Sequence, residues 1–291
     1  MCDQDTMNDA LAFAASPEGL SRRQFGALGL GAGFVSLLPA VANAAEVKES
    51  EVTIKTADGT CDAYFVHPTT GKHPAVLIWP DIFGLRDPFR KMGKRLAESG
   101  YTVLVINPFY RLQKAPTSPP NANFQDPAVR GTLMAQMGSL TAATTAVDAA
   151  AFISWLDKQA PTDTKRKMAT TGYCMGGPLT MRTAAAHPDR VGAGASFHGG
   201  SLVTDKPDSP HLLIPASDAG YLFAIADNDD AKDPEEKTRL KAALAPRKQW
   251  HEVEVYKGAM HGWCPPDGRA YDEAAAEKAW GRMLELFKAA L

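Results

Sequence analysis

The chain has 291 residues, with 31 Lys and Arg against 33 Asp and Glu, 45% hydrophobic and 22% charged residues. These proportions are typical of a globular protein and exclude a collagen-like, intrinsically disordered or small disulfide-stapled chain. A net charge of −2 gives no electrostatic basis for binding nucleic acid, so we expect no nucleic-acid partner.

The N-terminus has the features of an export signal. Arg22 and Arg23 precede an apolar Gly/Ala-rich run over residues 26–38, and Ala42-Asn43-Ala44 has the small-x-small form of a signal-peptidase site. The run is too short to span a bilayer. The arginine pair resembles a twin-arginine signal, whose partner is the twin-arginine export machinery. We therefore expect residues 1–44 to be cleaved from an exported, periplasmic protein without a membrane anchor; the alternative is an amphipathic helix with a chance arginine pair.

After this segment, apolar runs of strand length alternate with helical stretches. The pattern predicts an α/β fold with a mostly parallel sheet of about eight strands and helices on both faces. The first two strands read as an antiparallel hairpin turned by Asp58-Gly59. Predicted strands are residues 51–56, 61–66, 75–79, 102–106, 167–171, 192–197, 222–226 and 252–256. Predicted helices are residues 88–99, 127–136, 141–159, 177–186, 234–245 and 272–291.

We expect residues 45–291 to form a single domain, because no repeat or low-complexity tail interrupts the pattern. Residues 112–124 are rich in Pro, Asn and Ser and lack periodicity. They are predicted to be a surface loop near the C-terminal edge of the sheet, where loops often line a substrate entrance.

The mature chain keeps three cysteines, Cys61, Cys174 and Cys264, so at least one thiol has no partner within it. No CxxC or HxxxH pattern accompanies them, and we expect neither a metal nor a cofactor. Whether Cys61 and Cys264 pair is left open by the sequence.

A nucleophile motif follows the fifth predicted strand. Gly172-Tyr173-Cys174-Met175-Gly176-Gly177 has the form G-x-nucleophile-x-G and leads into a predicted helix. The glycines permit a sharp strand-to-helix turn, and the helix N-terminus favours thiolate over thiol. The alternative is a buried structural thiol.

Such a nucleophile needs a base and a carboxylate that orients the base. Predicted strands lead into Asp227-Asn228-Asp229-Asp230 and into a Gly-rich turn that contains His261. This gives the order nucleophile, acid, base that elbow hydrolases use. We favour Asp229 as the acid and His261 as the base, while Asp227 and Asp230 remain alternatives and each group could instead have a purely structural role.

Together the GYCMGG, ADNDD and MHGW motifs and an early WPDIFG segment resemble the dienelactone hydrolase family of the α/β-hydrolase superfamily. The resemblance covers nearly the whole mature chain. It implies an α/β-hydrolase fold and a Cys-His-Asp triad that hydrolyses small esters or lactones. Cys174 would be the nucleophile, His261 the base and acid, and Asp229 the orienting carboxylate. The N–H groups of Ile82 and Met175 would form the oxyanion hole.

Two departures from the family bear on the substrate. Asp81 stands where the family has a glutamate that pairs with the resting thiol, so control of the thiol is expected to differ. Arg111 can fill one position of the family's two-arginine clamp for a substrate carboxylate, but the second arginine is missing after His261. We therefore expect a related small ester or lactone with an aromatic or apolar part.

Four further side chains are expected to contact the substrate, with ordinary packing or strand capping as the alternative: Phe109, Tyr110, His198 and Trp263. Two other functions remain open for the chain. One is a non-catalytic binding protein on a hydrolase scaffold. The other is a redox-sensing protein in which Cys174 and Cys264 form a disulfide.

Overall fold

The computed structural model describes residues 38–291. The predicted export signal, including Arg22 and Arg23, falls mainly outside these residues. No single helix in the described range is long and apolar enough to cross a membrane. Two consecutive helices, Pro127–Met137 and Ala142–Asp157, together have the length and apolar composition of a span, but they are bent by 71° relative to each other.

One eight-stranded sheet forms the centre of the structure, with the strand order β1-β2-β4-β3-β5-β6-β7-β8. β1 pairs with β2 and β2 with β4 in antiparallel fashion, and the remaining pairs are parallel. The predicted fold class is confirmed. The strands are β1 (Val47–Thr56), β2 (Gly59–Pro68), β3 (Ala75–Trp79), β4 (Thr102–Ile106), β5 (Met168–Tyr173), β6 (Val191–Phe197), β7 (Gly220–Ala226) and β8 (His251–Tyr256).

The central strands are apolar or small along their whole length because helices cover both faces. Every residue of β3, β4, β5, β6 and β7 is buried, so no alternation of polar and apolar residues is needed there. β1 lies at an edge of the sheet and is mostly exposed or half-buried. This difference explains why short continuous apolar runs in the sequence predicted the central strands well.

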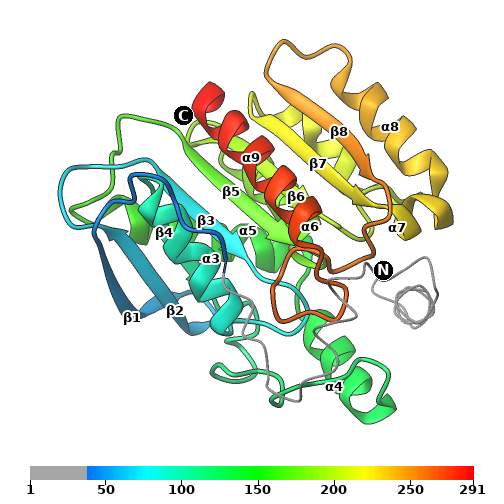
Figure 1. Ribbon diagram of the computed structural model, residues 1–291, viewed down its shortest axis with the longest axis horizontal. Helices are drawn as coiled ribbons and strands as arrows, with labels where there is room; N and C mark the ends of the chain where they lie inside the picture. The colour runs from blue at the N-terminus through cyan, green and yellow to red at the C-terminus, as the bar shows by residue number, and fades with distance from the viewer. Residues whose placement is uncertain (1–37) are drawn as a thin grey trace.

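Two layers of helices enclose the sheet. α3 and α9 lie on one face (Figure 1), where Phe89 and Phe287 belong to one buried apolar cluster. On the other face, Phe152, Leu179 and Leu240 from α5, α6 and α8 belong to a second cluster. The helical elements are α3 (Asp87–Glu98), α4 (Pro127–Met137), α5 (Ala142–Asp157), α6 (Gly176–Ala186), the 3-10 helix η1 (Pro210–Ala216), α7 (Asp227–Lys232), α8 (Pro234–Leu244) and α9 (Glu273–Ala290).

Parallel strands bring their carboxyl ends to one edge, and the loops after β3, β5, β6, β7 and β8 therefore meet there. Two short elements, η1 and α7, were not predicted. α7 follows β7 directly and begins at Asp227, within a segment predicted to be a loop. Its six residues are too few for a periodic apolar pattern to reveal a helix.

Candidate active site

The turn after β5 holds Cys174 in a strained backbone conformation. Its φ is +52°, in the left-handed region that residues other than glycine rarely adopt. The Cys174 N–H donates to the carbonyl of Phe197 at 3.0 Å, and the Cys174 carbonyl accepts from the N–H of Gly177 at 3.0 Å. The neighbouring strand and the first turn of α6 thus fix the backbone on both sides of the cysteine, as in a nucleophile elbow.

Two glycines make this sharp turn possible. A Cβ at Gly172 would lie 2.0 Å from the carbonyl oxygen of Gly176. A Cβ at Gly176 would lie 2.3 Å from the carbonyl oxygen of Trp79. Both obstacles are backbone atoms, which cannot turn aside as a flexible side chain can. The steric reason expected for the glycines therefore holds in the structure.

His261 and Asp229 form a hydrogen-bonded pair at the same edge of the sheet. Nδ1 of His261 lies 2.6 Å from Oδ2 of Asp229. His261 is buried, with 4% of its surface exposed. Because a carboxylate only accepts hydrogen bonds, Nδ1 carries a proton, and Nε2 is the ring nitrogen left for proton exchange.

The segment at the start of α7 fixes the loop that carries His261. Asn228 accepts the His261 backbone N–H on Oδ1 at 2.8 Å. Asp227 accepts the N–H of Gly258 on Oδ2 at 2.9 Å. Three consecutive side chains, those of Asp227, Asn228 and Asp229, therefore all bind the loop after β8, which holds the imidazole at a defined position.

The sequence left three aspartates open as the partner of His261. In the structure that partner is Asp229. Asp230 instead accepts two hydrogen bonds from Lys237, at 2.6 and 2.7 Å, and Asp227 binds the turn before the histidine. The role of Asn228 was missed, because an amide beside three aspartates gives no signal in the sequence.

A cavity of about 870 Å³ opens at this edge of the sheet. Cys174, His198 and His261 all line it, so the candidate nucleophile and base share one cavity. Its remaining walls come from three segments, residues 81–90, 115–124 and 262–270. Much of the Pro-rich loop predicted near this edge of the sheet therefore lines the cavity. Ile82 and Phe124 on these walls belong to a buried apolar cluster with Cys174 and Met175.

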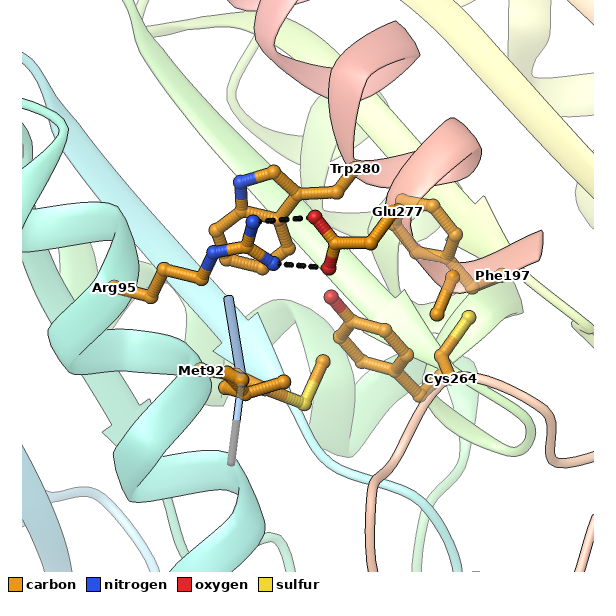
Figure 2. Close-up of a pocket in the computed structure, with 9 residues that line it drawn as sticks. Met92, Arg95, Phe197, Cys264, Glu277 and Trp280 are labelled. Carbon is orange, nitrogen blue, oxygen red and sulfur yellow. Dashed lines mark hydrogen bonds and ion pairs between the residues drawn. The ribbon is translucent and has the colours of Figure 1, made fainter. Parts of the chain in front are cut away.

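The Cys174–Cys264 disulfide of the redox-sensing alternative is not formed in the structure. Cys174 is disulfide-bonded, whereas Cys61 and Cys264 are buried free thiols. Cys264 lines a different, small cavity of about 10 Å³. Figure 2 shows it beside Phe197 and near the Arg95–Glu277 ion pair. Burial raises the pKa of the Cys264 thiol well above its ordinary value, which disfavours the reactive thiolate form.

Asp81, in the loop after β3, lines the cavity and is paired there with Arg86. Nη1 and Nη2 of Arg86 donate to the two Asp81 oxygens at 2.6 and 2.9 Å. Nε and Nη2 of Arg86 also donate to Asp267, at 2.7 and 3.1 Å. The guanidinium therefore joins the loop that contains Ile82 to the loop after His261. The N–H donors that would bind a substrate carboxylate are already used in these contacts.

Arg111 does not line the cavity, and the clamp expected of it has no support in its position. Its guanidinium donates to the buried carboxylate of Asp148 at 2.8 Å and to Asp58 at 2.6 Å. Tyr110 donates its hydroxyl to Asp148 at 2.6 Å. Both residues join the entry hairpin to α5. The sequence contained a signal for this pairing. Asp148 is a single charge in an otherwise apolar stretch of a predicted helix, and a buried carboxylate is normally paired.

We predict that Arg111→Met lowers the free energy of unfolding by about 3–5 kcal/mol at pH 8, because Asp148 would stay buried without its cation. Burial raises the pKa of Asp148, and the hydrogen bonds from Arg111 and Tyr110 oppose this rise. Without Arg111 the folded-state pKa rises further, so the loss of stability shrinks as the pH falls towards the unfolded-state pKa. Urea unfolding at several pH values measures this. Equal stability of variant and wild type at pH 8 would contradict it.

Phe109 and Trp263 also lie off the cavity lining. Phe109 is fully buried in the apolar cluster around Cys174, and Trp263 is fully buried with its ring stacked on Tyr256 at 5.2 Å. The packing alternative describes both better than substrate contact does. His198 does line the cavity. Between residues 38 and 291, no group of His, Cys, Asp and Glu side chains is arranged to hold a metal ion.

Comparisons with known proteins agree on one family. A family model described as "Dienelactone hydrolase family" matches residues 61–291. Carboxymethylenebutenolidase from Rhodococcus opacus is 27% identical over 245 residues, which is 79% of this chain and 87% of that protein. A solved "Putative Dienelactone Hydrolase" from Klebsiella pneumoniae subsp. pneumoniae MGH 78578 is 23% identical and covers 84% of this chain and 99% of its own, with a TM-score of 0.71. At 23% sequence identity, this structural similarity shows the fold alone.

Proposed function

The chain belongs to the dienelactone hydrolase family, and on this premise we propose that it hydrolyses a small ester or lactone through Cys174, His261 and Asp229. The observation that carries the proposal is the 2.6 Å hydrogen bond between His261 and Asp229, in a cavity that Cys174 also lines. An oriented imidazole and, once the disulfide of Cys174 is reduced, a thiol in the same cavity are the parts that nucleophilic acyl transfer requires. The active form is the reduced thiol.

In the proposed reaction, Nε2 of His261 takes the proton of the Cys174 thiol, and the sulfur forms a bond to the substrate carbonyl carbon. The developing oxyanion is stabilised by the backbone N–H groups of Ile82 and Met175. His261 then returns the proton to the departing oxygen as the carbon–oxygen bond breaks, which leaves a thioester. Water, deprotonated by His261, attacks this thioester and releases the acid and the thiol.

In this proposal neither Arg86 nor Arg111 binds a carboxylate of the substrate. The guanidinium of Arg86 is already shared by Asp81 and Asp267, and Arg111 is bound to Asp58 and Asp148 outside the cavity. Apolar side chains such as Ile82, Leu85 and Phe124 supply much of the remaining wall. A cavity of about 870 Å³ has room for an aromatic or branched acyl ester.

The test is a matched panel of substrates for the reduced protein: 4-nitrophenyl butyrate, dihydrocoumarin, and analogues of both that carry a carboxylate. We expect turnover of the neutral compounds and no advantage for the carboxylated ones. Prior alkylation with iodoacetamide should remove this activity in proportion to the label at Cys174. A protein that turns over none of the esters and lactones, or that keeps its activity when Cys174 is fully alkylated, would refute the proposed function.

Asp229→Asn should lower kcat for 4-nitrophenyl butyrate by about 10²–10⁴-fold, because the amide cannot hold His261 in the required tautomer or stabilise its charged form. The loss is expected to be smaller than that caused by removing the nucleophile or the base. Asp230→Asn is the matched control, since that carboxylate binds Lys237 instead of the histidine. Equal losses in both variants would count against a specific role for Asp229.

A further inference from the structure

His198 lines the cavity and has no assigned task in the mechanism. It follows β6 directly, and its backbone is held by a hydrogen bond from its N–H to the carbonyl of Ala224 at 2.8 Å. Its φ of +39° lies in the strained left-handed region, as does that of Cys174. Strain of this kind at two neighbouring positions of one cavity is typical of residues kept for function rather than for packing.

The imidazole of His198 is buried, with 1% of the residue exposed, yet neither ring nitrogen has a hydrogen-bond partner among the residues that the structure describes. A buried polar atom without a partner destabilises the folded state, so two such atoms on one ring call for an explanation. A ligand in the adjoining cavity would supply the missing partner.

Three aromatic rings hold the imidazole in a fixed orientation. His261 and Trp263 each pack edge-to-face against it with ring centroids 5.1 Å away, and Tyr173 lies at 6.1 Å. Burial lowers the pKa of His198 well below its ordinary value, and the neighbouring His261 adds to this effect. A neutral imidazole offers one N–H donor and one nitrogen acceptor, which suits uncharged polar groups and gives no ion pair to an anion.

We propose that His198 is a specificity-determining residue that donates a hydrogen bond to an uncharged oxygen of the bound ester or lactone. The inference rests on the proposed function and deepens it, because it names the group that recognises the polar part of a neutral substrate. The position of the His198 imidazole is fixed before the substrate binds, because other aromatic rings pack against it and the His198 backbone is hydrogen-bonded to β7. Recognition at this position therefore costs little conformational entropy.

The test compares His198→Phe with wild type on dihydrocoumarin under reducing conditions. We expect KM to rise about 10-fold with kcat changed less than about threefold, because one neutral hydrogen bond to the substrate is lost. We expect the Tm to stay equal or to rise, since the variant removes two unpartnered nitrogens from a buried position. His198→Gln, whose amide can again donate, should recover part of the lost affinity. An unchanged KM, or a higher KM accompanied by a fall in Tm, would overturn the inference.

Tyr256→Phe is the matched control. Its hydroxyl is also buried without a partner in the described part of the chain, and its ring stacks on Trp263, but it does not line the cavity. This variant should leave KM unchanged.

A binding measurement separates this inference from the proposed function. In the Cys174→Ala protein, ¹⁵N resonances of the His198 ring should shift when dihydrocoumarin is added, whether or not turnover occurs. Resonances that stay in place at millimolar probe would overturn the inference, while turnover by wild type would still support the function.

Discussion

Replacing Cys174 with alanine should lower kcat for 4-nitrophenyl butyrate by at least about 10⁴-fold and leave the protein folded. The strained turn supports this expectation. Cys174 has a φ of +52°, and strain of this kind is typical of residues kept for function. Alanine fits the same space, so the Tm should change little. Initial rates with purified, reduced protein and a Tm measurement on the same sample check both statements.

Cys264→Ala is the control for this experiment. Cys264 is a buried free thiol only three positions after His261 in the motif region, but it lines the small cavity beside Phe197 instead of the large one. We expect a modest loss of stability, on the order of 1 kcal/mol, and an unchanged kcat. If Cys174→Ala keeps the wild-type rate, the sulfur of Cys174 has no part in the reaction.

His261→Asn should lower kcat/KM by about 10³–10⁴-fold, because the asparagine cannot carry a proton from the thiol to the leaving oxygen. The loss should be largest for alkyl esters, whose leaving oxygen needs a proton, and smaller for 4-nitrophenyl esters, whose leaving group departs as an anion. Rates for the two ester classes, measured side by side, report this difference.

His251→Asn provides the comparison, since His251 is exposed at the start of β8 and its Nδ1 lies 2.8 Å from the carbonyl oxygen of the nearby Gln249. It should behave as wild type in both assays. Rates of His261→Asn that match wild type between about pH 6 and pH 9 would remove the histidine from the mechanism.

The positions of the central strands along the chain and their mostly parallel arrangement could be predicted, because each is a short apolar run buried on both faces. The G-x-Cys-x-G motif likewise predicted its own strand-turn-helix context, since in this turn a Cβ at position 172 or 176 would collide with the backbone and only glycine fits. α7 could not be predicted. It is stabilised by hydrogen bonds from the loop after β8, and such contacts between distant segments leave no local pattern.

The roles of the arginines show the same limit. Arg111 occupies the position that the family resemblance assigns to substrate binding, but Asp148 lies close enough to bind it, and this pairing depends on how α5 packs against the entry hairpin. Arg86 was not singled out from the sequence, although it joins two walls of the cavity. The export signal within residues 1–44 remains a prediction.

The most direct test of the account is the mass of the protein when the reaction with 4-nitrophenyl acetate is stopped by acid within milliseconds. We predict an adduct of one acetyl group per chain that appears before the steady state, maps to the peptide containing Cys174 and disappears as hydrolysis proceeds. Full turnover with no adduct, or a stable adduct on a different residue, would contradict catalysis through a thioester at Cys174.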